Sequence, residues 1–237
     1  TVINSGGIEN ISSGGLASGA TINSSGTQNI YSAGIASGAT ISGGAQYVNL
    51  GGSAMNATIA SGGAQYISSG AVVSGTTLLS AGSQNLLSGA SVTSTTVSTG
   101  GVQNLSSATL AISSILSGGT QNISSGGSAT ATIIRSGGIE NISTGGSDSN
   151  AVISSGGIQN VSSGGTANAM TISGGGTQNV FSTALASGGT IGSGGTQILS
   201  GGTASATVIS SAGTQTISAA GIASGATISA SGIQNIS

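Results

Sequence analysis

The stretch SGGIQNVSSGGTANA, residues Ser155–Ala169, holds two glycine pairs and one Gln-Asn pair, and close copies of it recur along the whole chain. Taking the Gln or Glu of that pair as the origin gives thirteen copies, spaced 18 or 19 residues apart. Such a period is the signature of a repeat architecture in which each unit packs only against its neighbours. The origins are Glu9, Gln28, Gln46, Gln65, Gln84, Gln103, Gln121, Glu140, Gln159, Gln178, Gln197, Gln215 and Gln234.

Three apolar columns run through the copies. A large aliphatic residue lies two residues after every origin, a second lies six residues before it in twelve copies, and a smaller residue, mostly Ala, lies eight residues after it. In the third copy the second column is occupied by Ile41, displaced by a one-residue deletion. Gly, Ser, Thr and β-branched residues disfavour helices and suit strands and turns. The pattern therefore predicts an all-β fold: a single-stranded parallel β-helix (β-solenoid) of about 13 coils of 18–19 residues. The unequal column intervals favour the right-handed form over a left-handed hexapeptide helix.

Glycine lies two residues before the origin in every copy. We expect these glycines to stand in turns and to supply a backbone with positive φ, which other residues adopt less readily. The predicted turn glycines are Gly7, Gly26, Gly44, Gly63, Gly82, Gly101, Gly119, Gly138, Gly157, Gly176, Gly195, Gly213 and Gly232.

The Gln-Asn pair forms two polar columns. Strand alternation points Asn outward if the next aliphatic residue points inward, and it places Gln on the inward face or at the corner where the turn begins. Stacked amides can hydrogen-bond from coil to coil, so both columns are predicted to be structural ladders. The alternative, compatible with the first, is that the outward column also docks another copy of the chain. The self-association candidates are its longest uninterrupted run: Asn85, Asn104, Asn122, Asn141, Asn160 and Asn179. In adjacent coils Tyr47 and Tyr66 replace Asn and are predicted to stack, and Tyr31 and Phe181 are expected to point outward.

Composition excludes several classes of function. Only 2% of the residues are charged, and Arg135 is the one basic side chain, which argues against a nucleic-acid partner and a polybasic membrane anchor. Cysteine and histidine are absent, and the single Asp does not fit a repeating calcium site. No apolar run is long enough for membrane insertion by this segment. No cofactor and no metal site is predicted.

An enzyme is not predicted either. Glu9 and Glu140 fall in the same column seven coils apart, too far to act together as the carboxyl pair that a glycosidase needs. Asp148, Glu140 and Arg135 share one coil and are expected to form a local ion pair or a small site, with Asp148 either paired inside or turned out by a bulge. No side chain of this group is an evident base near neutral pH, so no catalytic residue is assigned.

Units of the form T-x-I-x-S-G-G-x-Q-N-I-x-S-G-G-x-A-S-G-A resemble the passenger repeats of AIDA-type autotransporter adhesins, and the resemblance covers all thirteen copies. It implies a right-handed β-helical passenger on the surface of a Gram-negative cell, or secreted from it, that acts in self-association, autoaggregation, adhesion and biofilm formation. The implied partners are other copies of the chain, a host surface or glycans, and a glycosyltransferase that adds heptose to Ser and Thr.

Other functions remain alternatives at this point. The chain is read either as an acceptor for O-glycosylation (heptosylation), which is compatible with adhesion, or as a passive stalk or filament. Ice binding is disfavoured because the outward Thr column is single and is interrupted by Val2, Val152 and Val208. Residues 1–237 are expected to be one β-solenoid repeat domain, an uncapped fragment of a longer passenger, since the chain starts and ends inside a repeat.

Overall fold

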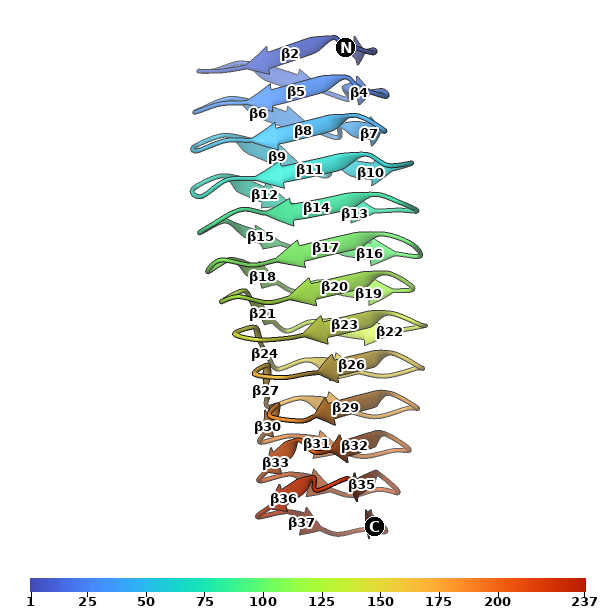
Figure 1. The fold of residues 1–237 in the computed structure, drawn as a ribbon. Coiled ribbons are helices and arrows are strands. Elements are labelled where there is room, and N and C mark those ends of the chain that lie inside the picture. The colour runs from blue at the N-terminus through green and yellow to red at the C-terminus, as the bar shows by residue number, and fades with distance from the viewer.

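The computed structural model describes residues 1–237 and is a right-handed parallel β-helix, which confirms the predicted fold class. The chain winds into a rod of stacked coils with its two termini at opposite ends (Figure 1). Each coil contributes one short strand to each of three parallel sheets, except that the last coil ends before the third sheet. No segment forms a helix of the length and apolarity needed to cross a bilayer.

The three sheets are named sheet A, sheet B and sheet C. Sheet A consists of β1 (Val2–Ile3), β4 (Thr21–Ile22), β7 (Thr40–Ser42), β10 (Thr58–Ala60), β13 (Thr77–Leu78), β16 (Thr96–Ser98), β19 (Ile115–Ser117), β22 (Ile133–Arg135), β25 (Val152–Ile153), β28 (Thr171–Ile172), β31 (Thr190–Ile191), β34 (Val208–Ile209) and β37 (Thr227–Ile228). Sheet B consists of β2 (Ile8–Ile11), β5 (Thr27–Ile30), β8 (Ala45–Val48), β11 (Ala64–Ile67), β14 (Ser83–Leu86), β17 (Val102–Leu105), β20 (Thr120–Ile123), β23 (Ile139–Ile142), β26 (Ile158–Val161), β29 (Thr177–Phe181), β32 (Thr196–Ser200), β35 (Thr214–Ser218) and β38 (Ile233–Ile236). Sheet C consists of β3 (Leu16–Ser18), β6 (Ile35–Ser37), β9 (Ser53–Met55), β12 (Val72–Ser74), β15 (Ser91–Thr93), β18 (Leu110–Ile112), β21 (Ser128–Thr130), β24 (Ser147–Ser149), β27 (Thr166–Asn168), β30 (Leu185–Ser187), β33 (Thr203–Ser205) and β36 (Ile222–Ser224).

The core is a narrow shaft filled by the predicted columns. In one coil, Ile153 of sheet A, Val161 of sheet B and Ala167 of sheet C all point inward and are at most 1% exposed. Each of them pairs in register with the equivalent residue of the next coil, so like side chains stack on like along the rod. All but two of the buried apolar residues, 39 in number, form one continuous cluster. A coil therefore buries its apolar side chains only in contact with its neighbours.

One register prediction is wrong. The residue six before Gln121 is Ile115, but Leu116 is the side chain that points into the core, and Ile115 faces outward on β19. The turn between sheets A and B is one residue shorter in this coil, as it is in the coil that holds Ile41. Two adjacent aliphatic residues hid the deletion, because either of them satisfies an apolar column.

The predicted reason for the invariant glycines is also wrong. None of the thirteen glycines two residues before the origin has positive φ. The residue just before each of them does, and there Ala81, Ala212, Ser25 and Ser231 stand in for Gly. The invariant position instead lacks space: a Cβ on Gly26 would lie 2.6 Å from the carbonyl oxygen of Ile3 in the preceding coil. Glycine is required there by the close approach of two backbones.

This difference predicts unequal effects of alanine at two adjacent glycines. In Gly101→Ala the new Cβ would lie 2.8 Å from the carbonyl oxygen of Leu78, so we expect a loss of about 3 kcal/mol in the free energy of unfolding, typical of overpacking. Gly100→Ala, at φ +75° with no backbone closer than 3.4 Å, is expected to cost only about 1 kcal/mol for left-handed backbone. Urea-induced unfolding followed by circular dichroism measures both, and equal losses would refute the assignment.

Candidate functional site

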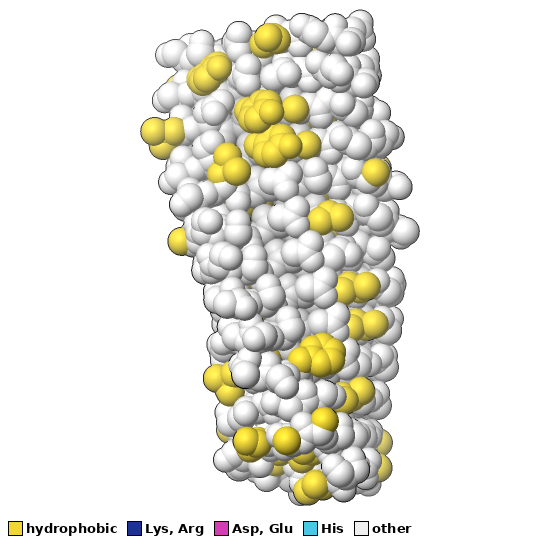
Figure 2. Space-filling model, in the orientation of Figure 1, with side chains coloured by type: hydrophobic (Ala, Val, Ile, Leu, Met, Phe, Trp, Pro, Cys, Tyr) yellow, Lys and Arg dark blue, Asp and Glu magenta, His cyan; other side chains and the backbone are white.

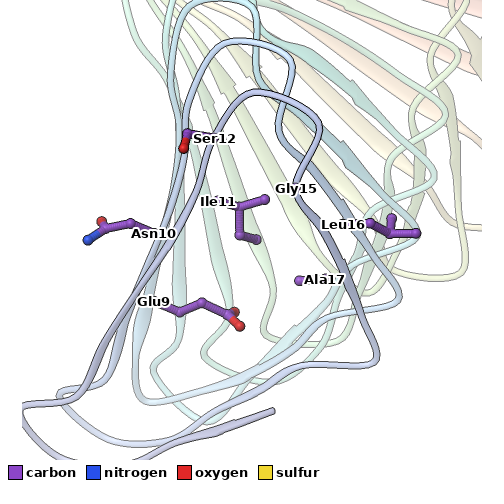
Figure 3. Close-up of a pocket in the computed structure, with 7 residues that line it drawn as sticks. All are labelled: Glu9, Asn10, Ile11, Ser12, Gly15, Leu16 and Ala17. Atoms are coloured by element: carbon purple, nitrogen blue, oxygen red, sulfur yellow. The ribbon is translucent and has the colours of Figure 1, made fainter.

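Each coil separates its side chains into an inner and an outer set. Figure 3 shows this for the first coil, where Glu9, Ile11 and Ala17 point into the shaft and Asn10 and Leu16 point away from it. These residues, with Ser12 and Gly15, line a hollow of about 250 Å³ at the mouth of the stack. The hollow is the interior of the first coil seen from its open face.

The outward asparagine column forms a hydrogen-bonded ladder on sheet B. In the run from Asn85 to Asn179, the Nδ2 of each Asn donates to the Oδ1 of the Asn in the preceding coil, over 2.8–3.0 Å. All six predicted residues of the run lie in one line and are half-buried. A primary amide has two N–H donors and two acceptor lone pairs. Within this ladder each amide uses at most one donor and one lone pair, so the others remain available at the surface.

The glutamine column points inward, which resolves the choice between the inward face and the corner. From Gln28 to Gln215 every origin residue is buried with no exposed surface. The Nε2 of each Gln donates to the side-chain oxygen of the preceding coil over 2.5–2.8 Å, in eleven of the twelve steps. Burying an amide is costly unless it is hydrogen-bonded, and the ladder meets that requirement from coil to coil.

Four buried hydroxyls accompany the glutamine ladder, and sequence reasoning missed them. They stand eleven residues after an origin and approach the Oε1 of its Gln at 3.2–3.5 Å. Other coils have mainly Ala at this corner. A run of hydroxyl residues in four successive copies of a mostly Ala position was the available signal. The residues are Thr76, Thr95, Ser114 and Thr132.

The acidic residues do not form the expected ion pair with Arg135. Asp148 points inward from β24 beside Glu140 of β23, and Gln159 Nε2 donates to one oxygen of each carboxyl group. Arg135 lies on the outer face of β22, is exposed and makes no salt bridge. Desolvation by burial raises the pKa of Glu140, and burial together with the neighbouring Glu140 raises the pKa of Asp148 to about 10. Neither carboxyl group faces solvent, so neither is placed to act on a substrate.

The outer surface is polar and almost without charge. Figure 2, in the view in which sheet B faces the reader, shows mostly white atoms with apolar side chains in small separate groups and no charged side chain. Tyr47 and Tyr66 stack as predicted, with ring centroids 5.0 Å apart and ring planes 12° from parallel. Tyr31 and Phe181 point outward, also as predicted, and are 43% and 41% exposed.

Comparisons with known proteins find similarity among solved structures. No family model matches the chain, and no curated protein matches it. Among solved structures, the chain is similar to a TibC-catalysed hyper-glycosylated TibA fragment. The TM-score is 0.97 and the sequences are 40% identical, over 100% of this chain and 87% of the TibA fragment.

The two amide columns are predicted to differ sharply in their contribution to stability. Gln178→Leu would leave Gln197 Nε2 without its acceptor and Gln159 Oε1 without its donor, both in the core. We expect a loss of about 2–4 kcal/mol, since each unsatisfied buried group costs about 1–3 kcal/mol. The adjacent Asn179→Ala removes only a half-buried amide and is expected to cost less than about 1 kcal/mol. Urea unfolding of the two variants tests this, and a larger loss for Asn179→Ala would contradict the assigned roles.

Proposed function

Since the chain belongs to the AIDA-type autotransporter adhesin passengers, we propose that residues 1–237 act as one segment of a cell-surface or secreted adhesin. The segment is a structural and interaction module and not an enzyme. It binds other copies of itself side by side, and through that association it contributes to autoaggregation, adhesion and biofilm formation. The asparagine ladder of sheet B is the observation on which the self-association proposal depends.

The ladder supplies a repeated set of free donors and acceptors. Along Asn85–Asn179 the spare N–H groups and lone pairs recur once per coil, held in line by the bonds between the amides. A second rod has the same spacing, so its ladder can meet the first in register over many coils. Each contact is weak, but joining several of them on rigid rods raises the overall affinity steeply.

The near-neutral net charge of the chain also favours side-by-side association of two rods. The net charge is −2 over 237 residues, so little long-range repulsion keeps like rods apart. A charged face of the same shape would have to be screened by salt before two copies could approach.

Glycosylation of surface hydroxyls is the second part of the proposal. The similar TibA fragment is described as hyper-glycosylated by TibC. In this chain, exposed hydroxyls stand four residues after the origin in seven successive coils, at the turn between sheets B and C. A glycosyltransferase could reach them without unwinding a strand, whereas the four buried hydroxyls beside the glutamine ladder are closed to it. The exposed residues are Ser69, Ser88, Ser107, Ser125, Thr144, Ser163 and Ser182.

Negative charge on the ladder is predicted to abolish aggregation. Changing Asn104, Asn122, Asn141 and Asn160 together to Asp removes the free donors and makes two facing ladders repel each other. We expect turbidity and sedimentation of the purified chain, or of cells displaying it, to fall to background while circular dichroism remains that of a β-rich fold.

A matched control separates the position of the charge from its amount. Thr21, Thr40, Thr58 and Thr77 occupy the outward column of sheet A in four successive coils, and changing all four to Asp adds the same charge on a different face. This variant is expected to keep aggregating. Docking through the asparagine ladder would be refuted if the Asn variant aggregated as much as the unchanged chain. It would also be refuted if the Thr variant lost as much aggregation as the Asn variant.

The glycosylation proposal predicts a selective pattern of modification. Co-expression of the chain with TibC should raise its intact mass by multiples of one sugar, and peptide mapping should place the sugars on exposed turn hydroxyls. Thr76, Thr95, Ser114 and Thr132 serve as internal controls and should stay unmodified because they are buried. An unchanged mass, or sugars on the buried set, would count against the proposal. If the mass is unchanged, TibC does not modify the chain, and the rod is a passive stalk as far as glycosylation is concerned.

A further inference from the structure

The glutamine ladder has one step without an amide donor, between Gln121 and Glu140. In the other steps one end of each side chain accepts a hydrogen bond from the next coil, and the other end donates to the preceding coil. Glu140 Oε2 is the accepting end, because Gln159 Nε2 donates to it over 2.6 Å. Glu140 Oε1 therefore stands where the other coils have Nε2, facing the preceding Gln121. It is buried and has no hydrogen-bond partner.

Asp148 has a matching unpartnered oxygen. It replaces the inward Ala of its column, between Ala129 and Ala167 of the adjacent coils, and is 1% exposed. Its Oδ2 accepts a longer bond from Gln159 Nε2 at 3.4 Å, while its Oδ1 is buried without a partner. Because Gln159 Nε2 donates to both Glu140 and Asp148, the two carboxyl groups lie next to each other in the shaft. Two carboxyl groups can hydrogen-bond to each other only if one of them carries a proton.

No positive charge is close enough to let the pair ionise cheaply. The side chains that face it from β20, β21, β26 and β27 are Gln121, Ala129, Gln159 and Ala167, and Thr132 faces it from the corner before β22; none of these titrates. Arg135 of β22 is on the outer face, and Glu9 is seven coils away in the first coil. Burial disfavours the charged form of both carboxyl groups, which raises both pKa values.

We propose that Glu140 and Asp148 form a neutral carboxyl pair that keeps two protons at neutral pH. The Glu140 Oε1 hydroxyl donates to Gln121 Oε1 and completes the ladder. The Asp148 Oδ1 hydroxyl donates to Glu140. Glu140 Oε1 and Asp148 Oδ1, which have no donor to accept from, each become the donor of a hydrogen bond. The shaft then carries no charge in this coil.

The pair makes the folded rod more stable at acidic pH than at neutral pH. Its carboxyl groups titrate at about pH 4 in an unfolded chain. Burial raises both pKa values in the folded chain, that of Asp148 to about 10. Between these values the folded chain holds protons that the unfolded chain has released. Stability therefore falls as pH rises through this window and recovers as pH falls. Most proteins lose stability in acid because their paired carboxylates must be protonated, so the sign here is the reverse.

Carbon-13 NMR of the carboxyl carbons of the full chain tests the protonation state directly. The chain has one Asp and two Glu, so the Asp148 signal is unique and the Glu140 signal is identified by comparison with a Glu140→Gln variant. We expect both carbons to keep the chemical shift of a protonated acid from about pH 5 to about pH 8. A shift typical of a carboxylate for either group at neutral pH would overturn the proposal.

Unfolding as a function of pH provides a second, independent test. The double variant Glu140→Gln/Asp148→Ala restores the residues that neighbouring coils have at these positions, so it is expected to fold. The urea midpoint of the unchanged chain should fall as pH rises from about 5 to about 9, and that of the double variant should stay nearly level. Glu9→Gln removes a carboxyl group from the same column in the first coil and should leave the slope of the unchanged chain in place. Equal slopes for the unchanged chain and the double variant would refute the pair as the cause.

Discussion

The whole rod depends on pairing a buried amide in each coil with the buried amide of the coil before it. From Gln28 to Gln215 the glutamine side chains have no exposed surface, so an unpaired one would lose its hydrogen bonds to water without replacement. A slip of one residue between two coils would turn Gln outward and Asn inward and would also expose the aliphatic residue of sheet B. The ladder therefore fixes the register that brings Ile over Ile, Ala over Ala and outward Asn over outward Asn.

The same chemical group serves two purposes on the two faces of sheet B. Inside, the Gln amides have little choice of partner, because the shaft provides only the coil above, the coil below and an occasional hydroxyl such as Thr95. Outside, the Asn amides bond to one another and still face water. Inward amides are thus committed to stability, while the outward ones retain capacity for a partner. This division allows the outer surface to vary without loss of the fold.

Much of this could be predicted from the sequence, because the period is strict and each column repeats up to thirteen times. The coil length, the inward aliphatic residues, the outward Asn run and the Tyr47–Tyr66 stack all follow from counting and alternation.

Conformation at single positions could not be predicted in the same way. An invariant Gly is compatible with positive φ or with a close approach of backbones, and only the three-dimensional path distinguishes them. The 18-residue spacing before Gln121 showed that a residue was missing, but not where, because Ile115 and Leu116 are both aliphatic. The direction of Arg135 depends on strand parity, which placed it outside and left Glu140 and Asp148 without a cation.

Each coil meets its neighbours through the same register at both of its faces, as the pairing of β11 with both β8 and β14 shows. Removing one complete repeat, or duplicating one, would bring together two surfaces that already match. A gene of this kind can therefore change length through slippage or unequal recombination between its repeats, while the encoded protein remains foldable after each event. The length of such a rod is then a trait that natural selection can adjust in increments of one coil.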